Sequence, residues 1–286
     1  MDFILYDRLE VIRKTINKYG EENFYISFSG GKDSTVLHYL IDEALPNNKI
    51  PRVFINTGIE YNYIREFVYS MKEKDERFLV FNSGVNIKKM LDEKGYPFKS
   101  KEHSCKLAMF QNKGNVTKSV NRYINGDSFS CPKILKYQFT DSFNLKVSDR
   151  CCYELKKNPI KKYEKESGRS VAILGLRMAE GGLRANHEGC VVFDNAHTLK
   201  KFKPLNPCSN EFIEWYIKRN DIKLCKLYYA PFNFKRTGCK GCPYNIKLQS
   251  QLDVMEKYLP DEKRQCESIW GPVYDEYRRI KYRLIK

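Results

Sequence analysis

Two groups of residues in this sequence combine types and spacings that suit chemistry. The first is the run SGGKDS at 29–34. Glycines let a backbone approach a phosphate without a Cβ clash, and the free N–H groups at the start of a helix attract anions. The run therefore predicts a phosphate-binding loop, against the alternative of a glycine turn that happens to contain a lysine. Its residues are Ser29, Gly30, Gly31, Lys32, Asp33 and Ser34.

The second group is a set of four cysteines. Cys151 and Cys152 are adjacent, and Cys239 and Cys242 form a C-x-x-C pair that begins 87 residues after Cys152. A C-x-x-C loop with glycine inside it can point both sulfurs at one centre. Four cysteines are the usual ligands of a [4Fe–4S] cluster, whereas structural zinc normally uses two C-x-x-C knuckles. The residues themselves leave an iron–sulfur cluster, zinc and redox-active thiols open.

The elements that must position these groups alternate along the chain. Buried strands are expected at 23–29, 52–58, 78–84 and 171–176, and amphipathic helices follow the first three. This alternation predicts an α/β fold, a mostly parallel twisted sheet with flanking helices. We expect a nucleotide-binding domain over 1–205, with a basic, partly helical insertion at 99–148, and a smaller cysteine-containing helical region over 206–286.

Composition narrows the classes of partner. The 286 residues include 51 Lys and Arg against 35 Asp and Glu, a net charge of +16, which favours nucleotide phosphates or nucleic acid as partners. The alternative is an ordinary enzyme with a lysine-rich surface. A mean hydropathy of −0.60 and no run of about 20 apolar residues argue against a membrane protein. Without a secretory signal, we expect a cytoplasmic, reducing compartment, where clustered cysteines serve metal or redox chemistry.

The loop and the segments after it resemble a known family. SGGKDS resembles the PP-loop of the adenine nucleotide alpha-hydrolase superfamily, which includes ATP pyrophosphatases, tRNA thiolases and the phosphoadenosine phosphosulfate (PAPS) reductase family. FINTGIEYNYIREFV (54–68) and LGLRMAEGGLRA (174–185) are similar to segments of the PAPS reductase branch, although Gly181 replaces an expected serine. The resemblance implies that the nucleotide also contacts Asn56, Thr57 and Gly58, and that Arg177 and Arg184 bind anionic substrate groups.

The cysteines extend this resemblance. The pair in CCYELKKNPIKKY (151–163), together with the later C-x-x-C, is similar to the pattern by which adenylyl sulfate (APS) reductases hold a [4Fe–4S] cluster. Reductases of the family also carry a nucleophilic cysteine in a Glu-Cys-Gly-Leu-His motif, which this sequence lacks. Its last cysteine, Cys266, lies in KRQCESIW, which predicts an ordered helix rather than a mobile tail.

The resemblance implies an enzyme that acts at the α-phosphate of an adenine nucleotide. The first interpretation is ATP pyrophosphatase-type adenylation that supports sulfur transfer, with tRNA or DNA as an acceptor; Mg²⁺ would then be needed, with Asp33 beside it. The second is an APS or PAPS reductase that releases sulfite and uses thioredoxin. The third is a non-catalytic nucleotide- or nucleic-acid-binding module. The sulfur donor and a homo-oligomeric state remain open. The catalytic candidates are Lys32, Asp33, Arg177 and Arg184.

The C-terminal segment 261–285 interleaves basic residues with aromatic ones. Such a pattern suits contacts to nucleic acid, but at helical spacing it favours a helix that packs its rings and leaves its charges in water. The aromatic residues are Trp270, Tyr274, Tyr277 and Tyr282.

Overall fold

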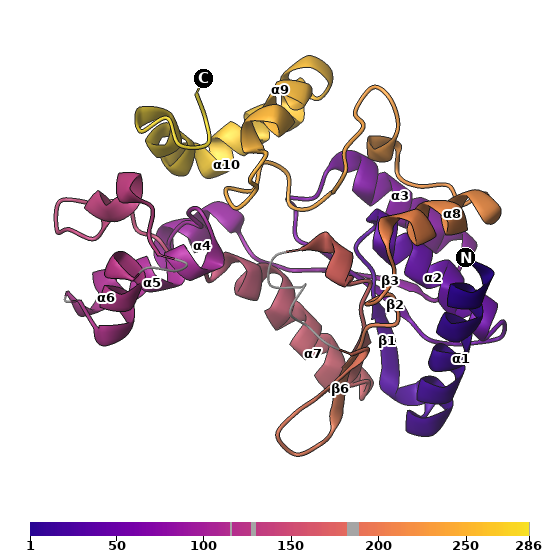
Figure 1. Ribbon diagram of the computed structural model, residues 1–286. Helices are drawn as coiled ribbons and strands as arrows, with labels where there is room; N and C mark the ends of the chain where they lie inside the picture. Colours follow the sequence, from indigo (N-terminus) through magenta and orange to yellow (C-terminus); the bar gives the residue numbers. More distant parts are fainter. Residues whose placement is uncertain (115, 127–129, 182–188, 286) are drawn as a thin grey trace. The chain divides into compact units, whose positions relative to one another are not determined.

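The computed structural model describes residues 1–114, 116–126, 130–181 and 189–285 (Figure 1). The chain forms two compact units that are interleaved in sequence, and each contains residues from both sides of residue 205, where the sequence suggested a boundary. The first unit comprises Met1–Asn56, Glu60–Asn82 and Pro159–Thr237, and the second comprises Thr57–Ile59, Ser83–Asn158 and Gly238–Lys286.

The first unit is built on a six-stranded sheet with the order β3-β2-β1-β4-β6-β5. Every neighbouring pair is parallel except β5 and β6, which are antiparallel at one edge. The α/β class and the four expected strands are confirmed, whereas β5 and β6 were not predicted. The strands are β1 (Phe24–Ser27), β2 (Arg52–Asn56), β3 (Phe78–Asn82), β4 (Val171–Ile173), β5 (Val191–Phe193) and β6 (Leu199–Phe202).

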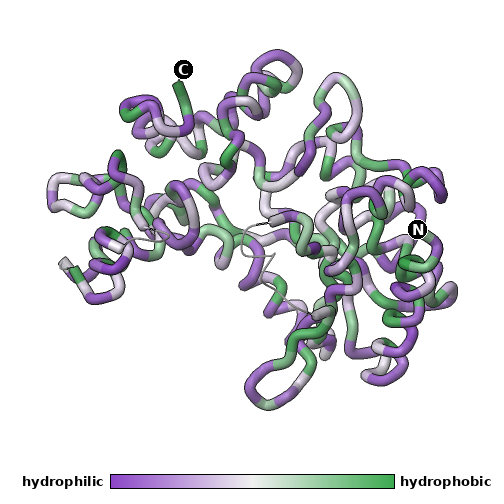
Figure 2. Tube along the Cα trace, in the orientation of Figure 1, coloured by the Kyte–Doolittle hydropathy of each residue, from purple (hydrophilic) through white to green (hydrophobic). Residues whose placement is uncertain are grey.

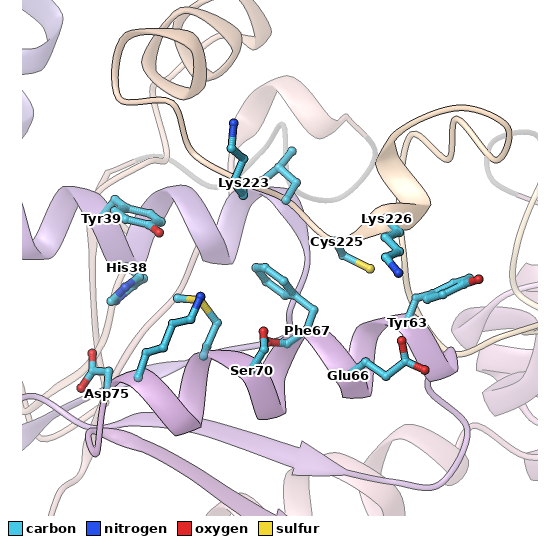
Figure 3. A pocket seen from close by; sticks show the side chains of 13 residues that line it. His38, Tyr39, Tyr63, Glu66, Phe67, Ser70, Asp75, Lys223, Cys225 and Lys226 are labelled. Atoms are coloured by element: carbon cyan, nitrogen blue, oxygen red, sulfur yellow. The ribbon is translucent and has the colours of Figure 1, made fainter.

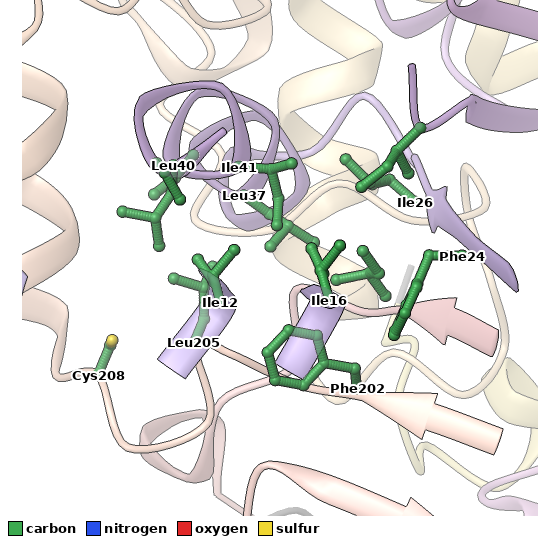
Figure 4. Close-up of a cluster of buried hydrophobic side chains, with 14 of the residues drawn as sticks. Ile12, Ile16, Phe24, Ile26, Leu37, Leu40, Ile41, Phe202, Leu205 and Cys208 are labelled. Carbon is green, nitrogen blue, oxygen red and sulfur yellow. The ribbon is translucent and has the colours of Figure 1, made fainter. Parts of the chain in front are cut away.

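Helices cover both faces of this sheet because side chains alternate along its strands. In β1, Phe24 and Ile26 pack into a cluster with α1, α2 and α8 (Figure 4). Tyr25 points the other way, toward Tyr163 of α7. The helices of this unit are α1 (Asp2–Tyr19), α2 (Lys32–Ala44), α3 (Asn62–Lys74), α7 (Asn158–Ser167) and α8 (Asn210–Arg219), with the short helices η1 (Glu21–Asn23), η4 (Met178–Glu180) and η6 (Lys226–Tyr228).

The strand order reverses next to β1. The chain runs from β1 to β2 and β3 on one side, and later returns to β4 on the other side of β1, where Ile26 pairs with Ile173. Ligands of open α/β sheets bind outside the carboxyl ends of the strands at such a reversal. The predicted phosphate loop follows β1, and Arg177 follows β4, so both lie at this edge of the sheet.

The second unit is mainly helical. Its described residues include an isolated bridge between Tyr96 and Val147. The segment 99–148 is partly helical, as expected. Along the helices of both units, apolar positions alternate with polar ones (Figure 2). The helices are α4 (Ile87–Lys94), α5 (Lys101–Lys113), α6 (Lys118–Asn125), α9 (Leu248–Tyr258) and α10 (Pro260–Arg279), with the short helix η2 (Lys133–Gln138) and a π-helical turn η3 (Tyr153–Lys157).

The basic C-terminal helix is confirmed as α10. Trp270, Tyr274 and Tyr277 are fully buried, so its rings pack within the unit, as the helical spacing favoured. Tyr282 lies beyond the end of the helix at Arg279. Among the described residues, no helix is long and apolar enough to cross a membrane.

Candidate functional site

Hydroxyl groups hold the predicted phosphate loop in shape between β1 and α2. The Ser34 hydroxyl donates to the Gly31 carbonyl at 2.9 Å and lies 3.0 Å from the Ser29 hydroxyl. Gly30 has a φ of +68°, and a Cβ there would lie 3.0 Å from the side chains of Ile64 and Val68. Only glycine fits this bend without strain, which explains the first glycine of the pair, Gly30.

A tyrosine from a distant part of the chain, which the sequence did not predict at this site, contacts the end of the loop. The backbone N–H of Lys32, the first residue of α2, donates to the Tyr228 hydroxyl at 2.9 Å, and that hydroxyl lies 2.9 Å from the Thr237 hydroxyl. The first N–H groups of a helix have no partner within the helix and are its natural anion ligands. Tyr228 therefore takes the place on the Lys32 amide that an anion would take. Tyr228 carries no local pattern that could have revealed this contact.

Arg177 and Asp33 form an ion pair at the reversal of the strand order. The Nε atom of Arg177 donates to the Asp33 carboxylate at 2.8 Å, and the other guanidinium nitrogens donate to the Cys208 carbonyl at 3.2 Å and the Asn210 side chain at 3.0 Å. Arg177 is 3% exposed. Its guanidinium is thus committed to protein partners in this structure, which suits a residue that positions Asp33.

A close backbone approach brings the two segments together. A Cβ on Gly175 would lie 2.9 Å from the Asp33 carbonyl oxygen and 3.1 Å from the Ser34 nitrogen. The glycine in LGLR is therefore needed for the β4 segment to pass the start of α2.

The charges around Asp33 oppose one another. Burial and the nearby Glu180 raise the pKa of Asp33, while Arg177 and Lys32 lower it, and the net direction is upward. Glu180 itself accepts from the Arg177 backbone N–H at 3.3 Å and forms an ion pair with Arg236. A bound cation such as Mg²⁺ would stabilise the ionised form of the Asp33 carboxyl, whose pKa the protein alone raises. Asp33 is therefore suited to lie beside a Mg²⁺ ion.

The remaining predicted nucleotide residues lie in different parts of the chain. Asn56 ends β2, and its side chain donates to Asn82 at the end of β3 at 3.0 Å. Thr57 and Gly58 follow directly but belong to the second unit. Arg184 lies outside the described residues, so its predicted role stays a prediction.

The four predicted metal-ligating cysteines all belong to the second unit, although they come from two distant segments. The thiols of Cys239, Cys152 and Cys242 lie close enough to Cys151 to raise its pKa by charge repulsion, in addition to the effect of burial. Cys151 and Cys152 begin a helical stretch that continues as the π-helical turn η3. Such turns are frequent at functional sites.

Helix α10 fixes the C-x-x-C loop through three backbone carbonyls. Trp270 donates to the Lys240 carbonyl at 3.1 Å, Tyr277 donates to the Pro243 carbonyl at 2.9 Å, and Tyr274 donates to the Gly241 carbonyl. Gly241 has a φ of +59°, and a Cβ there would lie 2.7 Å from the sulfur of Cys266. The aromatic residues of the C-terminal helix thus position two of the four cysteines.

The four interacting cysteines could hold a metal centre such as an iron–sulfur cluster. Burial raises the pKa of Cys242 to about 12, and charge repulsion from the neighbouring Cys239 and Cys152 adds to this effect. A bound cationic centre removes this penalty, and deprotonated thiolates are the form that binds metal. Lys156 is the nearby cation that partly offsets the repulsion.

The other candidate residues have structural surroundings. His103 is buried between the Tyr123 hydroxyl at 3.0 Å and the Gln138 side chain at 2.7 Å. Cys225 is buried in the first unit, and Cys190 is half-buried.

A pocket of about 570 Å³ lies in the first unit between α2, α3 and the segment 223–226 (Figure 3). Its described lining residues include Tyr39, Tyr63 and Phe67 but none of the predicted nucleotide residues. His38 and Asp75 line this pocket, and with Asp42 they hold their ligand atoms within 4.8 Å of one another. Arg52 and Arg77 both donate to Asp42, so internal cations already neutralise this group.

The sheet, the glycine loop at its reversal and the ion pair behind the loop are arranged as in a PP-loop α/β fold. The profile of the phosphoadenosine phosphosulfate reductase domain family matches residues 23–245, and the chain belongs to this family.

Curated relatives match only part of the chain. An uncharacterized protein of Methanocaldococcus jannaschii is 35% identical over 103 residues, which are 32% of this chain and 25% of that protein. An adenosine 5′-phosphosulfate reductase of Rhodococcus erythropolis is 34% identical over 94 residues, which are 33% of this chain and 36% of that protein. The match thus spans between a quarter and just over a third of these relatives' lengths.

Solved structures show weaker similarity. A phosphoadenylyl-sulfate reductase from Candida auris is 14% identical with a TM-score of 0.44, covering 81% of this chain and 93% of that one. A U34-tRNA thiolase from Methanococcus maripaludis with its [4Fe–4S] cluster is 17% identical with a TM-score of 0.42, covering 99% and 81%. These similarities assign no function to this chain.

Proposed function

We propose that this protein binds ATP at the loop 29–34, cleaves it between the α- and β-phosphates, and adenylates an acceptor for sulfur transfer, with nucleic acid as the acceptor. The observation that carries this choice over a reductase is the burial of Cys266. This residue is 0% exposed in α10, packed against Gly241, and burial raises the pKa of its thiol to about 12. A thiol that attacks a substrate must be accessible and easily ionised.

The proposed step is a displacement at the α-phosphorus. An oxygen of the acceptor forms the new bond to phosphorus, the bond to the bridging oxygen of the β-phosphate breaks, pyrophosphate leaves, and the acceptor's proton passes to solvent. Lys32 and the amides of the loop would stabilise charge on the phosphates, and Asp33 would hold Mg²⁺ beside them. Arg177 would position Asp33, and Arg184 would bind the anionic end. Such catalysis rests on positioning and charge stabilisation.

We further propose that Cys151, Cys152, Cys239 and Cys242 hold a [4Fe–4S] cluster. The mutual repulsion of their thiolates and the rigid C-x-x-C loop support this assignment. When bound, such a cluster supplies a charged, redox-capable group whose four positions are all filled by protein ligands.

The second candidate is an APS or PAPS reductase, which the adjacent cysteine pair and the family membership favour. Product analysis by mass spectrometry on protein purified without oxygen separates the two. ATP, APS and PAPS are each offered with Mg²⁺, and the last two also with thioredoxin. We expect AMP or an adenylated acceptor together with pyrophosphate from ATP; sulfite from APS or PAPS, with no product from ATP, would overturn the proposal.

A matched pair of variants tests whether the loop carries the turnover. We expect Lys32→Ala to abolish pyrophosphate release and Lys14→Ala, an 80% exposed lysine side chain on α1, to retain it. No turnover by the wild-type protein on any of the three nucleotides would favour a non-catalytic binding module instead.

A further inference from the structure

The positive charge of this protein is concentrated in one of its two units. The second unit contains 25 Lys and Arg against 14 Asp and Glu, a net charge of +11 out of the +16 of the whole chain, although it is the smaller unit. This is the unit that holds the four cysteines. The first unit, although larger, carries the remaining +5, so the excess of basic residues is denser in the second unit than a uniformly lysine-rich composition would make it.

Within this unit, basic residues gather around α6. Lys118 and Arg122 are four residues apart on its exposed side, while Val120 and Tyr123 are buried on the other. Residues at this spacing are neighbours on a helix surface. We call the following residues the α6 basic surface: Lys106, Lys118, Arg122, Lys133 and Lys136.

Two hydrogen bonds join the three segments that carry these residues. The Lys106 side chain of α5 donates to the Ser119 hydroxyl, next to Lys118. The Cys131 backbone N–H donates to the Tyr123 carbonyl at 2.7 Å, which brings the start of η2 to the end of α6. Lys133 and Lys136 are both exposed and three residues apart, so they lie on one side of this short helix.

The charges of the α6 basic surface are not neutralised within the described chain. Of the ion pairs between described residues, none involves these five side chains, whereas Arg52 and Arg77 of the first unit pair with carboxylates. Glu102 and Asp141 are the acids of 99–148 that the structure describes. When cationic side chains bind the phosphates of a nucleic acid, they displace the counterions condensed on it. This release of counterions supplies a large share of the affinity.

We propose that the α6 basic surface binds the phosphate backbone of the nucleic acid that serves as acceptor, an inference that rests on the proposed function. Nucleic acid fits better than an acidic protein because a duplex carries one charge per about 1.7 Å of its axis, so that several cations of this surface can each meet a phosphate of one duplex. The large exposed side chains near this surface, Val116 and Ile134, are aliphatic, so we expect contacts to phosphates rather than stacking on bases.

Hydrogen bonds connect this surface rigidly to the cysteine loop of the same unit. Tyr277 donates to the carbonyl of Pro243, the residue after Cys242, and accepts from the Lys99 backbone N–H at 2.7 Å. The Lys99 ammonium in turn donates to the Tyr123 hydroxyl of α6 at 3.0 Å. A nucleic acid held on α6 is therefore connected through these hydrogen bonds to the loop that carries Cys239 and Cys242.

The test measures binding of the full chain to a fluorescent 20-base-pair DNA duplex and to an RNA hairpin by anisotropy at several salt concentrations. We expect the double variant Lys118→Glu/Arg122→Glu to bind at least about tenfold more weakly and to lower the salt slope by about 2. The control is Lys14→Glu/Lys18→Glu, the same charge change at the same helical spacing on α1 of the first unit, which we expect to bind as the wild type does.

Several outcomes are decisive. Equal binding of nucleic acid by the two double variants would overturn the proposal, provided that both match the wild type in iron content and unfolding midpoint. It would also be overturned if poly-glutamate displaced the labelled nucleic acid as effectively as unlabelled nucleic acid of equal charge. Selective weakening of DNA binding or of RNA binding supports it and names the acceptor. Pyrophosphate release from ATP is assayed separately on the wild type without any acceptor. That assay tests the proposed chemistry, whereas the binding assay tests only the α6 basic surface, so the two can fail independently.

Discussion

The Tyr228 hydroxyl accepts the backbone N–H of Lys32 at 2.9 Å, so a tyrosine from η6 lies on the amide that starts helix α2. An amide N–H donates well to one acceptor at a time, and a nucleotide phosphate at this position must replace the hydroxyl. The segment that follows Tyr228 is held within the first unit by two ring contacts, of Phe234 with Tyr61 and of Phe232 with Tyr63.

Removal of this hydroxyl should strengthen nucleotide binding. In Tyr228→Phe the Lys32 amide loses its competing acceptor, and we expect ATP to bind about threefold more tightly, since one neutral hydrogen bond contributes roughly 0.5–1.5 kcal/mol. Calorimetric titration with a non-hydrolysable ATP analogue measures it. Tyr229→Phe is the control, because that hydroxyl accepts from the Leu224 amide instead. Weaker binding in Tyr228→Phe would mean that the hydroxyl is a phosphate ligand.

Asp33→Asn should impair both stability and turnover. The substitution leaves the buried Arg177 guanidinium without its carboxylate, and we expect a loss of about 2–4 kcal/mol in the free energy of unfolding together with at least about 100-fold slower pyrophosphate release. Urea unfolding and a pyrophosphate assay measure the two effects. Asp221→Asn, at an 85% exposed side chain, is the control. Full activity in Asp33→Asn would contradict the role proposed for this carboxylate.

Loss of one cluster ligand should remove iron. We expect the anaerobically purified wild type to contain about four iron atoms per chain, and Cys239→Ser to lose most of them. Cys105→Ser, at a half-buried cysteine of the same unit, should retain its iron. Elemental analysis and visible absorbance measure the result. Stoichiometric zinc in place of iron would refute the cluster assignment.

Cys266→Ala distinguishes packing from catalysis. The buried thiol packs against the C-x-x-C loop, so we expect a loss of about 1–2 kcal/mol in stability and pyrophosphate release within about twofold of the wild type. The measurement is kcat in a temperature range where both proteins are folded. A complete loss of turnover with folding intact would instead indicate that Cys266 is a nucleophile.

His103 should make stability depend on acidity. Burial lowers its pKa to about 4, below the ordinary value near 6.5, so its stabilising contribution is complete above pH 6.5 and is lost as pH falls toward 4. The difference corresponds to about 3 kcal/mol. In His103→Gln we expect the unfolding free energy to fall less steeply over this range than in the exposed control His197→Gln. Identical slopes in urea unfolding at pH 4–7 would contradict this expectation.

Local sequence determined the parts of the site that depend on neighbouring residues. Gly30 of the loop 29–34 is required by a turn between a strand and a helix, and the spacing of Cys239 and Cys242 suits a tight loop. These are short-range constraints, and the residue types themselves satisfy them. The alternation of apolar strands and amphipathic helices determined the α/β class for the same reason.

Tertiary structure alone decided which distant residues share a site. Arg177 pairs with Asp33, 144 positions away, because β4 returns beside β1, and Tyr228 reaches the Lys32 amide across 196 positions. The strands β5 and β6 are short, and their pairing depends on β4 rather than on their own pattern. The aromatic residues of α10 looked like a nucleic-acid contact or a packed face, and burial decided for packing against the cysteine loop. Such contacts arise from chain topology, which no local spacing encodes.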